Sequence, residues 1–323
     1  MSLRSLVRAS GLTLALFAFW VPQGYATENE AQVQALLSQM SKAVRELNYR
    51  GLFTYEYGGS LETLRVVHAV KDGVEFERLQ HLSGPEREVL RQGQAVDCLH
   101  PGDQLLRGRL SALGENTDLY KHYHFYIRGS ERVAGREAIV VQVIPKDKYR
   151  YGYTLGIDKA TGLPLKSLLI GGKKRVLERF QFVELELGPM IGKQDYQPAS
   201  TRHRLADHQL SACNQDQPAQ SEHWQITWLP EGFVLSGQRR SENNSDMLMY
   251  TDGLTAFSVF IEPAAGQALM EGRAQRGATV AYMSQLVRNQ VPYRITVVGE
   301  VPAVTAQRVA ASISPLPPAT QAH

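Results

Sequence analysis

The chain has 323 residues, of which 43% are hydrophobic and 21% charged, a composition typical of a folded protein of one large or two moderate domains. Lysine and arginine number 35 against 32 acidic residues, and this near-balance argues against a dedicated nucleic-acid binder. Two cysteines exclude a disulfide-dense scaffold and a four-cysteine zinc site.

The first 26 residues have the pattern of a cleavable export signal. Arg4 and Arg8 precede an apolar run over residues 11–21, and Gly24 and Ala26 supply the small residues of a cleavage site. The apolar run is shorter than a membrane span, which takes about 20 residues. We therefore predict that the chain is exported and cleaved after Ala26.

Residues 27–190 are predicted to form the first domain, a curled antiparallel sheet with helical cover. Residues 30–48 have the apolar spacing of one amphipathic helix. Short apolar or alternating runs then follow, separated by turns such as Asp72-Gly73. The predicted strands are residues 52–57, 64–70, 74–79, 88–91, 138–144, 149–157, 165–170 and 176–187. Hairpin-length links favour a meander whose concave face is filled by helices.

Residues 191–221 are predicted to be a polar linker, with a short helix over 200–208, because hydrophobic periodicity disappears there. A second, smaller domain is predicted over residues 222–315, followed by a disordered tail over 316–323. Its expected strands are residues 225–228, 233–239, 247–250, 255–261, 279–286 and 293–299. Pro302 then starts a helix at a favoured first-turn position.

The sequence contains none of the motifs that mark a nucleotide site, a serine-hydrolase elbow or a zinc protease. His122 and His124 could supply two metal ligands, but surface or hydrogen-bonded histidines are the simpler interpretation. Glu184 and Glu186 could form a carboxylate pair, although a solvated strand edge explains them as well. We therefore predict a binding protein without a cofactor or metal, and not an enzyme. A secreted hydrolase with an unrecognised site is the minor alternative.

Aromatic stripes and basic clusters are the candidates for binding. Two aromatic stripes either fill the core, which is the favoured interpretation, or line a cavity. They consist of Phe53, Tyr55 and Tyr57, and of Tyr149, Tyr151 and Tyr153. Basic clusters occur at residues 146–151 and 173–175, at Arg87 with Arg91, and at Arg239 with Arg240. Cations beside aromatic rings can hold a phosphorylated headgroup, whereas the simpler reading is a solvated face.

Cys98 and Cys213 would meet an oxidising compartment after export. They lie 115 positions apart in the sequence, and spacing alone does not decide whether they pair. A disulfide between Cys98 and Cys213 and two separate thiols both remain open.

Four segments resemble the RseB/MucB family. They are residues 84–93 (GPEREVLRQG), 227–233 (TWLPEGF), 250–259 (YTDGLTAFSV) and 295–302 (ITVVGEVP), the last followed by Thr305 and a helix to Ile313. The resemblance runs from about residue 30 to residue 314. It implies an α+β protein: an N-terminal unclosed antiparallel β-barrel like the lipoprotein carriers LolA and LolB, with helices on its concave face, and a smaller C-terminal α/β domain.

The same resemblance implies a periplasmic regulator of an envelope-stress sigma factor. Such a protein binds the periplasmic part of a RseA- or MucA-type anti-sigma factor and shields it from regulated proteolysis. Binding of lipopolysaccharide, lipid or a lipoprotein acyl chain is expected to release the anti-sigma factor. A lipoprotein or lipid carrier of the LolA type is the alternative, and homo-oligomerisation stays open.

Candidate binding residues follow from these expectations. Aromatic residues and arginine dominate binding hot spots, and this favours a partner site at Trp228, Phe233, Arg239, Arg240, Tyr250 and Phe257. Trp228, Phe233 and Phe257 could equally form the core of the second domain. Lipid is expected on the interior of the first sheet, beside Phe53, Tyr55, Phe76, Leu90, Tyr151 and Tyr153, with Arg87 and Arg91 near a headgroup. A shift of one residue in strand register would invert these faces.

Overall fold

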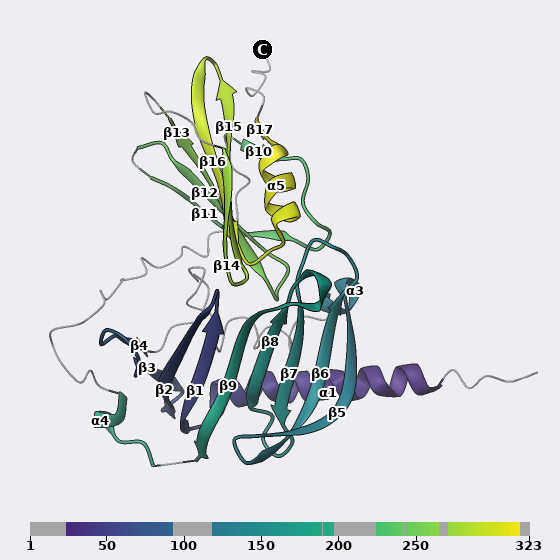
Figure 1. The fold of residues 1–323 in the computed structure, drawn as a ribbon, viewed down its shortest axis with the longest axis vertical. Coiled ribbons are helices and arrows are strands. Elements are labelled where there is room, and N and C mark those ends of the chain that lie inside the picture. The colour runs from purple at the N-terminus through teal and green to yellow at the C-terminus, as the bar shows by residue number, and fades with distance from the viewer. Residues whose placement is uncertain are drawn as a thin grey trace, which may run out of the picture.

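The computed structural model describes residues 24–92, 118–188, 190–196, 224–241, 243–264 and 271–316. Two antiparallel sheets stand end to end in it, the larger one built from the first part of the chain (Figure 1). Cys98, Cys213, the predicted helix over 200–208 and residues 1–23 of the predicted export signal lie outside the described residues.

The first sheet has nine strands in the order β4-β3-β2-β1-β9-β8-β7-β6-β5. The two end strands, β4 and β5, do not pair with each other, so the sheet is curled but not closed, as predicted. The bounds are β1 (Tyr49–Tyr57), β2 (Ser60–Lys71), β3 (Val74–His81), β4 (Glu88–Gln92), β5 (Tyr123–Val133), β6 (Arg136–Pro145), β7 (Gly152–Asp158), β8 (Pro164–Ile170) and β9 (Val176–Leu187). Strand β5 is absent from the predicted strands, because its polar residues at 128–132 interrupt the expected alternation.

Helix α1 (Gly24–Glu46) crosses the concave face of this sheet (Figure 1). Its buried residues Val33, Leu37 and Met40 pack with the sheet residues Val141 and Leu155. The helix begins at Gly24, earlier than the predicted residue 30. The sequence does not indicate this earlier start, because the first turns of the helix have no apolar stripe. Burying this face supplies the main stabilisation of α1, at about 1.5–3 kcal/mol for each large apolar side chain.

The second sheet has six strands in the order β11-β12-β13-β16-β15-β14, and one helix covers it. Ala306 and Val309 of the helix pack against Val280 and Val297 of the sheet. This confirms the smaller C-terminal α/β domain. The bounds are β11 (Val234–Arg240), β12 (Asp246–Thr251), β13 (Ala256–Pro263), β14 (Gly272–Arg276), β15 (Thr279–Arg288), β16 (Val291–Gly299) and α5 (Ala303–Ala311), with β10 (Trp224–Ile226) pairing with β17 (Ile313–Pro315).

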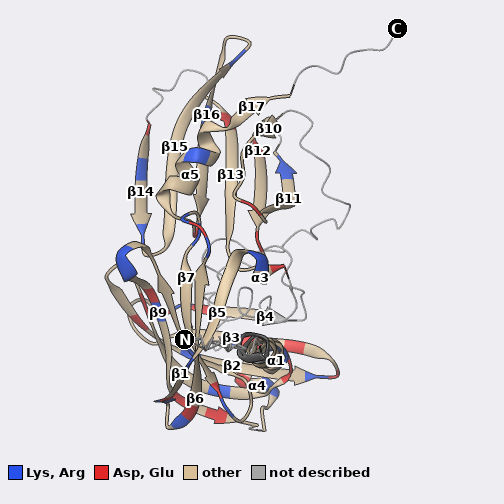
Figure 2. Cartoon of the chain, turned by 90° about the vertical axis from the view of Figure 1, so that its right-hand side faces the viewer, with Lys and Arg blue, Asp and Glu red and all other residues tan. Residues whose placement is uncertain are grey.

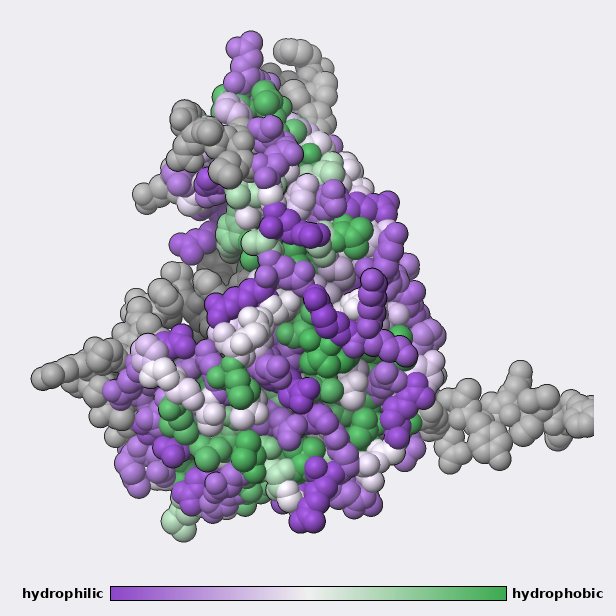
Figure 3. Space-filling view, viewed as in Figure 1, coloured by the Kyte–Doolittle hydropathy of each residue, from purple (hydrophilic) through white to green (hydrophobic). Residues whose placement is uncertain are grey.

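Three short helical turns complete the described chain: α3 (Leu119–His122), η1 (Gly172–Lys174) and α4 (Lys193–Tyr196). The segment containing α4 packs on the outer face of the first sheet, where Ile191 is buried beside Val67 and the Tyr196 ring lies 4.5 Å from that of Phe76. Apolar and polar side chains alternate over much of the outer surface in Figure 3. Within the described ranges, no helix is long and apolar enough to cross a membrane.

Candidate functional site

The two sheets meet at a joint built from the ends of their strands. One buried hydrophobic cluster contains Met40 of α1, Tyr151 and Tyr153 at the start of β7, and Leu254 and Ala278 from two turns of the second domain. The helix on the concave face and the second sheet therefore share one packed core. Such close packing fixes the relative position of the two domains more firmly than a polar linker would.

An arginine-aspartate pair forms the charged centre of the joint. Arg150 of the first domain and Asp252 of the second have fully buried side chains whose charged atoms lie 3.0 Å apart. Arg150 also donates to the backbone oxygen of Glu231 at 2.5 Å, and the Tyr123 hydroxyl donates to Asp252 at 2.9 Å. The other Asp252 oxygen accepts the backbone N–H groups of residues 254 and 255. A buried charge needs such a set of partners to offset its desolvation.

The residues on either side of Arg150 extend the joint to α5. The Tyr149 backbone oxygen accepts the Thr305 hydroxyl at 2.8 Å, and the Tyr149 hydroxyl accepts a guanidinium hydrogen bond from Arg308 at 2.5 Å. The Tyr149 ring packs edge-on against Trp228, with 4.9 Å between ring centres. The Tyr151 hydroxyl donates to the backbone oxygen of Val301 at 3.1 Å. Three consecutive residues of the first domain thus hold the second.

Burial at the joint raises two tyrosine pKa values. The pKa of Tyr151 rises to about 12, because burial disfavours the charged phenolate. The pKa of Tyr123 lies well above its usual value, first because of burial and second because of the Asp252 carboxylate. Both phenols therefore act as neutral hydrogen-bond donors at neutral pH.

Two glycine turns form the other side of the joint. Gly58 in the β1–β2 turn has a φ of +53°, and Gly277 in the β14–β15 turn has a φ of +59°. A Cβ at Gly58 would come within 2.6 Å of the Arg276 side chain, so only glycine permits this approach. Glu178 on β9 completes the contact: one carboxylate oxygen accepts the Ala278 N–H at 3.0 Å and the other accepts the Tyr55 hydroxyl at 2.8 Å.

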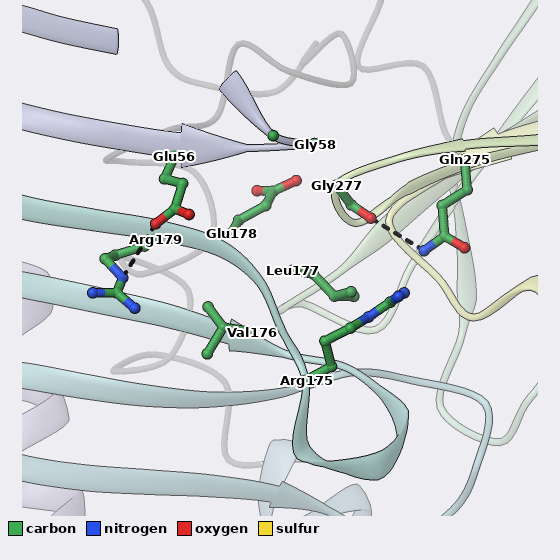
Figure 4. Close-up of a pocket in the computed structure, with 10 residues that line it drawn as sticks. Glu56, Gly58, Arg175, Val176, Leu177, Glu178, Arg179, Gln275 and Gly277 are labelled. Atoms are coloured by element: carbon green, nitrogen blue, oxygen red, sulfur yellow. Dashed lines mark hydrogen bonds and ion pairs between the residues drawn. The ribbon is translucent and has the colours of Figure 1, made fainter. Parts of the chain in front are cut away.

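A half-open pocket of about 460 Å³ lies between these turns. Figure 4 shows residues of both domains around it. Its lining consists of Glu56, Gly58, Gly59, Arg175, Val176, Leu177, Glu178, Arg179, Gln275 and Gly277. Concave sites where two domains meet are common places for ligand binding. Among the described residues, no cluster of histidine, aspartate or glutamate could hold a metal ion.

The structure divides the predicted partner residues into core and surface. Phe233 and Phe257 belong to the buried core of the second domain, as the alternative interpretation has them, and Tyr250 is buried in the same core. The Trp228 ring lies at the joint, where the Arg308 guanidinium stacks over it at 4.1 Å. Arg239 and Arg240, on the end strand β11, are exposed, and Arg240 lies 3.9 Å from Asp246.

The predicted lipid-lining residues do not share one face. Phe53, Tyr151 and Tyr153 are buried on the concave side, and Tyr55 is partly buried there. Phe76 is on the opposite side, where it packs with Tyr196.

Leu90 lies beside Arg78, which in turn pairs with Val67 of the outer face, so Leu90 also faces outward. The expected interior position of Phe76 and Leu90 is therefore wrong, because the pairing of β2, β3 and β4 turns both side chains to the outer face. Arg87 is partly exposed and lies 3.5 Å from Glu62. Arg91 is on β4, and nothing is described of its side chain.

The basic cluster at 146–151 has a structural role that the sequence analysis missed. Its Arg150 is buried against Asp252, and its Lys146 donates to the backbone oxygen of Tyr120 at 2.7 Å. Arg150 is therefore not available to a headgroup. A cation flanked by two tyrosines, together with an aspartate inside the segment 250–259, was the signal that could have revealed the joint.

Comparison with known proteins covers both domains. The chain matches the family model of the MucB/RseB N-terminal domain over residues 32–200 and that of the MucB/RseB C-terminal domain over residues 218–314. It is 39% identical over 289 residues to the sigma factor AlgU regulatory protein MucB of Pseudomonas aeruginosa, covering 86% of this chain and 90% of that protein. It is 30% identical over 300 residues to the sigma-E factor regulatory protein RseB of Escherichia coli K12, covering 86% and 89%.

Solved structures resemble the chain over the same span. A crystal structure of MucB in complex with MucA(peri) aligns with a TM-score of 0.71 and 37% identity, covering 88% of this chain and 98% of that chain. The Pseudomonas aeruginosa MucA/MucB complex aligns with a TM-score of 0.73 and 36% identity, covering 88% and 99%.

Proposed function

The chain belongs to the MucB/RseB family of sigma factor regulatory proteins, and on this premise we propose that it is a periplasmic negative regulator of an envelope stress response. It binds the periplasmic domain of a RseA/MucA-type membrane anti-sigma factor and shields that domain from regulated proteolysis. Binding of lipid or lipopolysaccharide releases the anti-sigma factor. The observation that carries the proposal is the similarity, over both domains, to MucB solved in complex with MucA.

The proposal assigns separate tasks to the parts of the chain. Residues 1–26 direct export and are removed after Ala26. Residues 27–190 form the lipid-sensing domain and residues 222–315 the partner-binding domain, with a tail over 316–323. Residues 191–221 form the linker, whose first residues, 191–196, pack on the first sheet. Trp228, Arg239 and Arg240 contribute to the partner surface, because the two arginines are exposed and Trp228 lies at the joint beside Tyr149.

The packed joint supplies a physical basis for the release. A partner that favours this domain arrangement and a lipid that favours another oppose each other through their differential affinities. Phe53, Tyr151 and Tyr153 are packed beneath or beside α1, so an acyl chain enters only by parting α1 from the sheet. A coupling of about 1–3 kcal/mol would change partner affinity roughly 5–150-fold.

The experiment is a titration of residues 27–323 against the periplasmic domain of the anti-sigma factor from the same organism, with and without lipopolysaccharide. A site-1 protease assay on the same mixtures measures shielding. We expect saturable binding, slower cleavage at stoichiometric ratio, and weaker binding with lipopolysaccharide. Failure to bind the anti-sigma domain, with lipid still bound, would replace the proposal with the LolA-type carrier.

A further inference from the structure

A run of three cations occupies the turn before β9. Lys173, Lys174 and Arg175 are consecutive and exposed. Across the part of the chain that the structure describes, no salt bridge joins any of them to an acidic residue. Figure 2 shows this basic turn beside the lower end of β14. Like charges held this close repel one another, and an anion bound between them would offset that repulsion.

The acidic residues of the adjoining pocket are already engaged. Glu56 lies 3.5 Å from Arg179, and Glu178 accepts hydrogen bonds from Ala278 and Tyr55. The lining itself contains two arginines and two glutamates, so its formal charges balance, and Arg175 brings one end of the basic turn into it (Figure 4). The excess positive charge comes from Lys173 and Lys174 on the adjoining turn.

The pocket walls suit a polypeptide better than an acyl chain. Only Val176 and Leu177 are apolar among the lining residues. Gly58 and Gly59 are exposed. A Cβ at Gly59 would meet nothing within 4 Å, so the backbone is open to a ligand at this turn. An extended segment can reach such backbone groups. A volume of about 460 Å³ is within the range of ligand sites, roughly 300–1,000 Å³.

From this geometry we propose that the pocket and the turn 173–175 bind a carboxylate-rich segment of the partner. Arg175 pairs with a side-chain carboxylate, and the segment contacts the first domain at β9 and the second at Gln275 and Gly277. This inference rests on the proposed function for the identity of the partner, but not for the chemistry of the pocket. A segment seated there contacts both domains and so stabilises the arrangement that joins them.

The first test changes charge alone. The variant K173Q/K174Q/R175Q removes the three cations, and the control R128Q/R132Q/K159Q removes three exposed cations elsewhere on the first domain. Affinity for the anti-sigma periplasmic domain is measured at several salt concentrations. We expect about tenfold weaker binding and a shallower salt dependence for the first variant, and less than a twofold change for the control. Equal effects of the two variants would overturn the proposal.

The second test fills the pocket without changing charge. Val176 and Val183 are both on β9 with 39% and 59% of their surface exposed, but only Val176 lines the pocket. V176W should weaken binding of the anti-sigma domain by about tenfold, and V183W should leave it unchanged. Binding that tolerates V176W would contradict the assigned place.

A third arm separates this proposal from the proposed function. Hexaglutamate and inorganic phosphate are titrated against the wild type and K173Q/K174Q/R175Q without any partner. We expect hexaglutamate to bind the wild type and to bind the triple variant about tenfold more weakly. No loss in the variant, or binding of phosphate in preference to the peptide, would overturn the pocket chemistry. Hexaglutamate binding that is lost in the variant supports the pocket even if the anti-sigma domain itself fails to bind.

Discussion

Removing the charge of Asp252 should destabilise the joint more than any exposed charge change. Asp252 and Arg150 are fully buried and 3.0 Å apart, and D252N keeps an oxygen that can still accept the N–H groups of residues 254 and 255. D252N removes the negative charge that faces the Arg150 guanidinium, which is fully buried and has no contact with solvent. Leaving one buried partner uncompensated costs about 3–5 kcal/mol, although the intact pair itself contributes much less. Because Asp147 still lies 3.2 Å from Arg150, we expect D252N to fall at the lower end of that range.

A double variant distinguishes the cost of leaving Arg150 without Asp252 from the contribution of the intact pair. R150M/D252N removes both charges, so we expect it to be more stable than D252N alone, with a strongly non-additive cycle. R150K should resemble a loss of the pair, because one ammonium cannot reach Asp252, Asp147 and the Glu231 carbonyl as the guanidinium does.

Tryptophan fluorescence during urea unfolding measures these effects in residues 27–323. That chain has only Trp224 and Trp228, both in the second domain, and Trp228 also contacts Tyr149 across the joint. A decrease of about 3 kcal/mol in the free energy of unfolding corresponds to a melting temperature lower by roughly 6–12 °C. A D252N loss below about 1 kcal/mol, or additive single variants, would refute the role given to the pair.

Three further predictions concern single sites. G232A should lower the melting temperature, because residue 232 has a φ of +86° and a Cβ there would lie 2.2 Å from the His122 ring; H122A should recover only the steric part, and an unchanged melting temperature for G232A would exclude this contact. Y151F should remove the tyrosine that ionises near pH 12 in a spectrophotometric titration. Because the folded-state pKa of Tyr151 lies above the unfolded value of about 10, the stabilisation by the neutral phenol is complete below about pH 10 and is lost as the pH rises to about 12. Burial opposes ionisation of Asp158, but hydrogen bonds from Arg136 and Thr161 outweigh burial and hold the pKa of Asp158 below its usual value. The stabilisation by the ionised Asp158 is present above about pH 4 and is lost as the pH falls further. D158N should therefore flatten the acid side of a curve of stability against pH, and an unaltered acid side would disprove this role.

The sequence by itself predicted features that depend on local pattern. The apolar spacing from Val33 to Val44 predicts α1 because a helix displays such residues on one face. Asp72-Gly73 and Gly171-Gly172 predict hairpins because their backbones enter turn conformations at low cost. The four family segments predict membership, and the family models over residues 32–200 and 218–314 confirm it.

Only the tertiary structure decided which face each strand buries and where the two domains touch. Phe76 and Phe53 are both aromatic residues in predicted strands and look alike in the sequence. The register of β2 and β3 nevertheless turns Phe76 outward against Tyr196. Arg150 reads as a solvated cation in the chain and is instead buried, because Asp252, some hundred residues later, supplies its charge partner. Periodicity encodes contacts within one element, whereas face and joint depend on pairings between distant segments, which no local pattern contains.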